Sequence, residues 1–367
     1  MKTPRRLLSS VLSLMVAAGI LAGCGSASTP APAEQKPAAE QKPAAPEPAK
    51  EQVVNIYTAR HYAVDDVLYA DFTKKTGIKV NVVKGSAPEL IERLKREGQS
   101  TPADLFITVD GGVLNTAKEA GVLQPVKSAT VDQNVPQHLR DKDNHWIGLS
   151  TRARVIVYAK DRVQPDQLST YEDLASEKWR GKLLVRSSTN LYNQSLVASL
   201  IALNGEQATA EWAKGIAANL ARKPEGGDRD QAKAIVAGVG DVAIMNTYYV
   251  GQMVNAKDAE EAKVGKAVGV FFPNQQTTGT HINISGVGLT KHSKNPEAAV
   301  KLIEFLTSQQ AQELMSKENY EYPVNPKAQW PELLASWGKF KAQQIDFAKL
   351  GEYNKLALQL MDKAGWK

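Results

Sequence analysis

The sequence predicts an α/β fold, because short apolar strands alternate with amphipathic helices from Val53 onward. A long extended run, residues 148–158, is typical of a strand that passes between two lobes. The chain of 367 residues is also long enough for two domains with a sizeable core. We therefore expect two α/β lobes joined by crossing strands.

The N-terminus has the pattern of a secretory signal. Three basic residues within the first six precede an apolar stretch, residues 7–20, and small residues then lead to Cys24. This stretch is too short to span a membrane. Cys24 is the only cysteine, so the exported domain has no internal disulfide. We expect a signal peptide over residues 1–23.

Residues 24–51 are predicted to be a disordered tether. They are rich in Pro, Ala, Glu and Lys and contain no aromatic residue, so they cannot bury enough surface to fold. The folded domain should then occupy residues 52–367.

The first part of this domain is expected to contain three strands and three helices. A helix that begins at Asp65 has Gly77 as its stop, and a capping box at Ser86 and Glu89 opens the next helix. The third helix starts after Asp110 and ends at Gly121. The strands are expected over residues 53–57, 78–83 and 103–109.

The second part repeats the alternation after the extended run. We expect strands over residues 183–185 and 242–245, and helices over residues 169–179, 193–203, 206–220 and 230–236. Residues 265–272 and 281–289 have the pattern of a return crossing. A helix capped at Asn295 follows, and the chain should end in a helical pair over residues 331–364.

Four tyrosines and a histidine follow three of the predicted strands. His61 and Tyr62 come after the first strand, Tyr192 after the strand over 183–185, and Tyr248 and Tyr249 after the strand over 242–245. Ligands of open α/β sheets bind beyond the carboxyl ends of the strands. These side chains are therefore candidates for one binding site.

The chemistry of this set favours a trivalent metal. A free phenol has a pKa near ~10, so phenolate at neutral pH needs a strong local positive charge. Zinc and copper prefer imidazole and thiolate ligands, which leaves Fe(III) as the candidate. The alternative is that the tyrosines simply pack, since adjacent tyrosines are usually a half-buried aromatic pair.

Several short motifs resemble a known family. Residues 21–24 (LAGC) resemble the cleavage motif of bacterial lipoproteins. Together with the tether and two lobes, they resemble the substrate-binding proteins of ABC importers. The motifs at 55–62 (NIYTARHY), 179–182 (WRGK), 190–193 (NLYN) and 248–249 (YY) look like its tyrosine-rich ferric-iron-binding branch. The similarity covers about residues 52–330.

This resemblance implies a metal site with named residues, which are His61, Tyr62, Tyr192, Tyr248 and Tyr249. The tyrosines would bind Fe(III), and His61 matches a histidine that is a ligand in some members and swings free in others. Arg152 matches an arginine that offsets phenolate charge or holds a carbonate, and Arg60 is a weaker candidate for the same role. The sequence lacks the first-turn carboxylate of relatives that bind a phosphate with their iron.

The resemblance also implies an architecture and partners. It implies the type II periplasmic-binding-protein fold, with one lobe over about residues 52–150 and 280–325. The other lobe would span about residues 151–279 with the C-terminal helices 331–364. Cys24 would carry the lipid that holds a monomer on the outer face of the cell membrane, where an ABC permease would receive its iron.

Other functions are less well supported. Without Lys2, Arg5 and Arg6 the formal charge falls from +6 to +3, too little to indicate nucleic-acid binding. A binding protein for a polyamine or carboxylate would use the same cleft and is the main alternative. An enzyme is not expected, because the usual hydrolase, metalloprotease and nucleotide-binding motifs are missing and the remaining histidines are scattered.

Overall fold

A computed structural model describes residues 52–367. The predicted signal peptide, the tether and Cys24 lie outside the described residues. Within residues 52–367 no helix combines the length and apolar character that a bilayer crossing requires.

The described chain alternates strands and helices, as expected. The strands are β1 (Val53–Thr58), β2 (Lys79–Lys84), β3 (Leu105–Thr108), β4 (Leu123–Gln124), β5 (Ile147–Ala159), β6 (Leu183–Leu184), β7 (Val242–Asn246), β8 (Val268–Phe271), β9 (Ile282–Thr290) and β10 (Tyr322–Pro323). The α-helices are α1 (Ala63–Thr76), α2 (Ala87–Glu97), α3 (Gly111–Glu119), α4 (Ala129–Asn134), α5 (Leu191–Asn204), α6 (Glu206–Ala218), α7 (Asp228–Val236), α8 (Thr247–Val254), α9 (Ala259–Ala267), α10 (Pro296–Thr307), α11 (Gln309–Asn319), α12 (Glu332–Ser336), α13 (Ala348–Glu352) and α14 (Asn354–Lys363).

The strand order is β2-β1-β3-β9-β5-β7-β6, with β4, β8 and β10 attached at the side. In the first half, β1 pairs in parallel with both β2 and β3. In the second half, β6 pairs in parallel with β7. Parallel strands need crossover connections, and helices supply them here.

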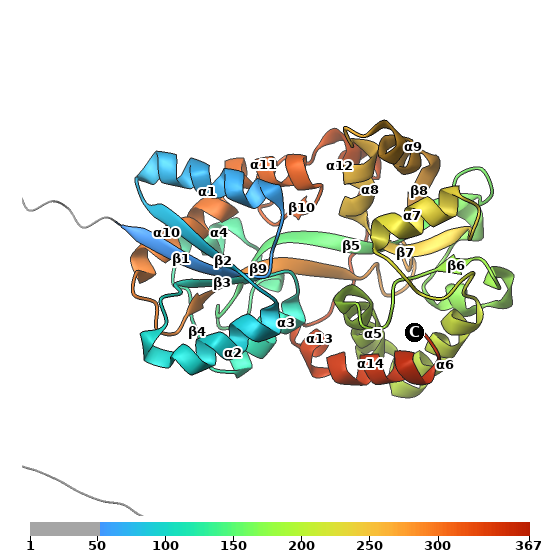
Figure 1. Ribbon diagram of the computed structural model, residues 1–367, viewed down its shortest axis with the longest axis horizontal. Coiled ribbons are helices and arrows are strands. Elements are labelled where there is room, and N and C mark those ends of the chain that lie inside the picture. Colours follow the sequence, from blue (N-terminus) through green and yellow to red (C-terminus); the bar gives the residue numbers. More distant parts are fainter. Residues whose placement is uncertain (1–51) are drawn as a thin grey trace, which may run out of the picture. The chain divides into compact units, whose positions relative to one another are not determined.

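Strand β5 connects the two halves. Its first part, up to Ala153, pairs with β9, and its second part, from Arg154, pairs with β7. Figure 1 shows β5 and β9 running together from one half of the fold to the other. The predicted α/β fold with two lobes and crossing strands is confirmed, although the residue boundaries of the lobes stay a prediction.

The central strands of the fold lie in its core. The core consists of apolar side chains from both halves, and every residue of β3 and β7 is buried. Burial on both faces explains why these strands read as apolar runs rather than as alternating patterns.

Two predictions were wrong, the helix over residues 169–179 and the crossing over residues 265–272. Residues 169–179 form two short 3₁₀ segments, Glu172–Ala175 and Glu177–Trp179, instead of a continuous helix. The backbone of Ser176 is extended between them, so the helical ladder is broken there. Residues 265–272 do not cross back either, since they contain the end of α9 and then β8, which pairs with the distal part of β5. Of the two segments expected to make the return crossing, β9 does so.

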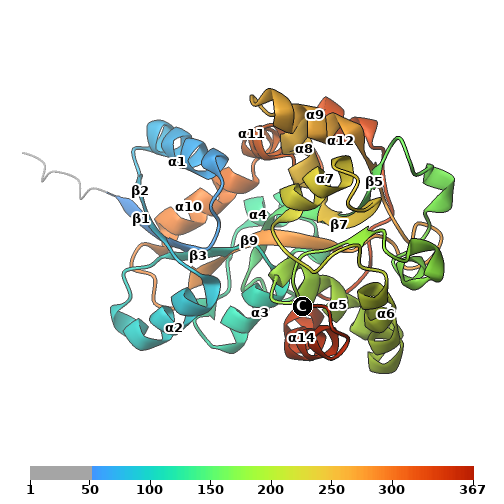
Figure 2. The same cartoon turned by 45° about the vertical axis from the view of Figure 1, so that its right-hand side comes forward.

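The C-terminal segment is more broken than the predicted helical pair, because residues 338–345 between α12 and α13 are not helical. Helix α13 packs against both α3 and α5, and α14 lies beside α5 (Figure 2). At the α3 contact, a Cβ on Gly112 would lie only 2.5 Å from the Gly351 nitrogen. Two glycines therefore allow these backbones to touch.

Candidate metal centre

Three segments supply the predicted ligands, each at the start of a helix. Tyr62 is the extended N-cap residue of α1, directly after His61. Tyr192 lies in the first turn of α5, where the Asn190 side chain accepts a hydrogen bond from the Asn193 nitrogen. This capping bond fixes the start of α5 and with it the position of Tyr192.

The third segment joins β7 to α8 without a loop. Asn246 ends the strand and is the N-cap of the helix, so Tyr248 and Tyr249 fall in its first turn. Tyr248 is fully buried, whereas Tyr249 is half-buried. Their rings stack at a tilt with centroids 4.2 Å apart.

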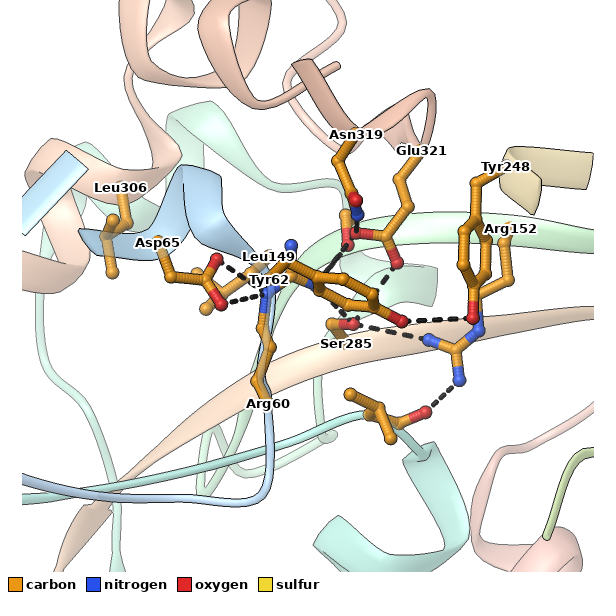
Figure 3. Close-up of polar contacts among 12 residues, drawn as sticks. Arg60, Tyr62, Asp65, Leu149, Arg152, Tyr248, Ser285, Leu306, Asn319 and Glu321 are labelled. Carbon is orange, nitrogen blue, oxygen red and sulfur yellow. Dashed lines mark hydrogen bonds and ion pairs between the residues drawn. The ribbon is translucent and has the colours of Figure 1, made fainter. Parts of the chain in front are cut away.

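The phenol hydroxyls of the three segments meet. The Tyr62 hydroxyl donates to the Tyr248 hydroxyl at 3.0 Å, and the Tyr248 hydroxyl donates to that of Tyr192 at 3.2 Å. Figure 3 shows the Tyr62 and Tyr248 oxygens pointing toward one another. Residues separated by 56 and 186 positions in sequence therefore bring hard oxygen donors together.

The surroundings keep the phenols of Tyr62, Tyr248 and Tyr249 protonated when no cation is bound. Burial raises the pKa of Tyr62 and of Tyr248 well above the ordinary value, and neighbouring phenol charge adds to the effect. Burial, with the nearby Tyr192, raises the pKa of Tyr249 to about 12. A ligand that ionises these groups must therefore supply a large positive charge.

His61 lies at the edge of the site. Its ring centroid is 4.8 Å from that of Tyr62, and its side chain is exposed. His61, Tyr62, Tyr249 and Arg229 line a cavity of about 660 Å³ beside the phenols. The cavity leaves room for His61 to move and for an additional small ligand.

Arg60 and Arg152 are both buried beside the phenols. The Arg60 guanidinium carbon lies 4.6 Å from the centre of the Tyr62 ring, and that of Arg152 lies 5.6 Å from the centre of the Tyr192 ring. Arg152 donates to the Val109 carbonyl and, at 3.3 Å, to the Ser285 hydroxyl (Figure 3). Arg152 therefore places a positive charge next to the oxygens, whereas the charge of Arg60 is paired with two carboxylates.

Sequence reasoning missed a second group of charges around Tyr192. The guanidinium carbons of Arg154 and Arg186 lie 5.9 and 5.6 Å from the centre of its ring. Both arginines pair with Asp228, a fully buried carboxylate, at 3.0 and 3.4 Å. A hint was available, since Arg154 directly precedes the apolar run over residues 155–157 of β5, where a charge has to find a partner.

Glu321 was also missed. It is buried and forms an ion pair with Arg60 at 2.8 Å. Burial alone would raise its pKa, but the charges of Arg60 and Arg152 outweigh that effect and lower it. It lies between α11 and β10, far from the tyrosines in sequence, and no local motif marks it.

Comparison with known proteins identifies the family. Residues 68–342 match the family of bacterial extracellular solute-binding proteins. The chain is also 46% identical over 369 aligned positions to "Iron uptake protein A1" of Synechocystis sp., covering 100% of this chain and 99% of that protein. The chain belongs to the bacterial extracellular solute-binding protein family.

Solved structures similar to this solute-binding protein include two that are named for iron. One is the Trichodesmium protein IdiA (FutA) in complex with iron and citrate ligands, with a TM-score of 0.82, 48% identity and coverage of 86% of this chain and 100% of that chain. The other is a ferric binding protein from Campylobacter jejuni, with a TM-score of 0.81, 43% identity and coverage of 86% and 100%. These relatives confirm the predicted family and type II fold. The relatives are named for iron uptake or iron binding and not for an enzyme, which agrees with the prediction that this chain is not an enzyme.

Proposed function

We propose that this solute-binding protein captures Fe(III) with the phenolate oxygens of Tyr62, Tyr192, Tyr248 and Tyr249 and delivers it to an ABC importer. The observation that carries the proposal is the chain of phenol contacts, 3.0 and 3.2 Å long, between three separate segments. The relatives named for iron uptake support the same cargo.

The donor set favours the ferric ion over the ferrous ion. Each phenolate is a hard anionic donor, and the higher charge of Fe(III) repays more of the cost of removing its proton. Four phenolates and Fe(III) carry a net charge of −1. The guanidinium groups of Arg152, Arg154 and Arg186 around Tyr192 offset this surplus.

His61 is the candidate fifth ligand, and an anion could complete the coordination. The cavity beside Tyr62 and Tyr249 has space for carbonate, as the family resemblance implies, or for a carboxylate such as the citrate of the Trichodesmium complex. Arg229 lines the same cavity and would attract either anion.

The proposed cycle places the protein outside the cytoplasm. A lipid on Cys24 would hold it on the outer face of the membrane, and the tether would give the monomeric domain reach. The two lobes would close as the phenols of one meet those of the other, and the permease would receive the ion when the lobes part.

Metal analysis tests this function. After incubation with excess ferric citrate and gel filtration, we expect the purified protein to retain about one iron per chain, because the candidate phenols lie at one site. Calorimetric titration with putrescine and with succinate should give no binding heat. A protein that emerges without iron, or that binds either organic ligand instead, would refute the proposal.

A further inference from the structure

Three consecutive residues at the end of α11, Asn319, Tyr320 and Glu321, are here called the clasp. The backbone of Tyr320 is left-handed, with φ 58° and ψ 25°, and its nitrogen donates to the Ser316 carbonyl. Within residues 52–367 the other non-glycine residues with positive φ are Asn144 and Asn274. Asparagine tolerates this conformation well and tyrosine does not, so the contacts of the clasp must hold it.

One side of the clasp contacts α8, the helix that carries Tyr248 and Tyr249. The Gln252 amide donates to the Asn319 side-chain oxygen at 2.7 Å. Next to it, Gly251 lets the Tyr320 side chain approach so closely that a Cβ on Gly251 would lie 2.5 Å from the Tyr320 Cβ and 2.6 Å from its Cγ. Residues 251 and 252 lie one turn after the two tyrosines, so this contact fixes the part of α8 that presents them.

The other side of the clasp holds the turn that carries Tyr62. The Glu321 carboxylate accepts a hydrogen bond from the Asn319 amide at 2.8 Å and pairs with the Arg60 guanidinium at 2.8 Å. Arg60 also binds both carboxylate oxygens of Asp65, at 2.8 and 3.0 Å. With its partners fixed, Arg60 lies under the Tyr62 ring (Figure 3).

The clasp therefore touches the two segments whose phenols meet, although it supplies no phenol of the cluster itself. The Asn319 side chain joins its two sides, since its oxygen faces α8 and its nitrogen faces Glu321. We propose that the clasp is a positioning device that holds α8 against the Tyr62 turn and slows the release of the bound ion. The inference rests on the proposed function, because the ion is taken to be Fe(III).

The substitution Gly251→Ala tests the clasp. The added methyl group would collide with Tyr320 and separate α8 from Asn319, although alanine is the better helix former. We expect iron to leave the ferric-loaded variant about tenfold faster than the wild type in stopped-flow transfer to excess EDTA, by analogy with the roughly 10–100-fold effects of residues that orient ligands.

A second variant separates positioning from general damage. Tyr320→Gly removes the colliding side chain and suits the positive φ, so Gly251→Ala combined with Tyr320→Gly should release iron more slowly than the product of the two single effects predicts.

Gln252→Met, which removes only side-chain hydrogen bonds, should also speed release, and it provides the measurement if Gly251→Ala does not fold. Gln309→Met is its control, because the same change there removes an exposed side-chain hydrogen bond to Glu313, at the opposite end of α11 from the clasp.

The two proposals fail differently. A wild-type protein that retains no iron contradicts the proposed function. A wild type that binds iron, with single variants that release it at the wild-type rate or with strictly multiplicative effects in the double variant, overturns the clasp and leaves the iron site intact.

Discussion

Replacing Tyr248 with phenylalanine is expected to weaken ferric-iron binding by more than about 100-fold, since even residues that only orient metal ligands typically contribute about 10–100-fold. Tyr248 is the central member of the phenol chain, because its hydroxyl accepts from Tyr62 and donates to Tyr192. The substitution removes one anionic donor and leaves the ring, which is fully buried, to pack as before. Competition against a chelator of known ferric affinity measures the loss.

Tyr57→Phe is the matched control. Tyr57 is equally buried, but its hydroxyl donates to Glu97 and not to another phenol. This variant should bind iron like the wild type. If Tyr248→Phe binds as tightly as Tyr57→Phe does, Tyr248 is not a ligand and the tyrosine site is wrong.

Iron affinity should fall steeply as the pH is lowered. At neutral pH the phenols of Tyr62, Tyr248 and Tyr249 hold their protons in the iron-free protein, because burial raises all three pKa values, that of Tyr249 to about 12. Iron binding must displace these protons, and lower pH favours the protonated, iron-free form. Each displaced proton changes the affinity by about tenfold per pH unit, so these three phenols alone contribute about a thousand-fold.

Chelator competition at pH 6 and pH 7, corrected for protonation of the chelator, measures this slope. In Tyr249→Phe the slope should be smaller by one proton, because that variant has one phenol fewer to ionise. An affinity that does not change between the two pH values would show that the ion is bound without ionising these phenols.

Much of the fold was predictable because its signals are local. Buried strands such as β3 and β7 appear as short apolar runs, and the capping box at Ser86 and Glu89 is present where α2 begins. The tyrosines could be found because each follows a strand, where α/β folds bind ligands. The structure brings Tyr62, Tyr192 and Tyr248 into contact, as that placement predicts.

The charges around the phenols could not be predicted in the same way. Asp228 and Glu321 lie far in sequence from the arginines that they bind, and only tertiary packing makes them buried partners. The clasp was equally hidden, since its contact with Gly251 depends on how α8 and α11 approach. The helix predicted over residues 169–179 is not formed, because extended backbone at Ser176 interrupts a sequence with helical spacing.

The most direct test of the central claim, that ionised tyrosines bind ferric iron, is an absorption titration of the purified protein with ferric citrate. Phenolate bound to Fe(III) absorbs visible light, so a band should grow linearly and saturate at about one iron per chain. Resonance Raman spectra excited in that band should show tyrosinate ring vibrations. A protein that stays colourless in excess ferric citrate, or that holds iron without tyrosinate vibrations, would contradict the account.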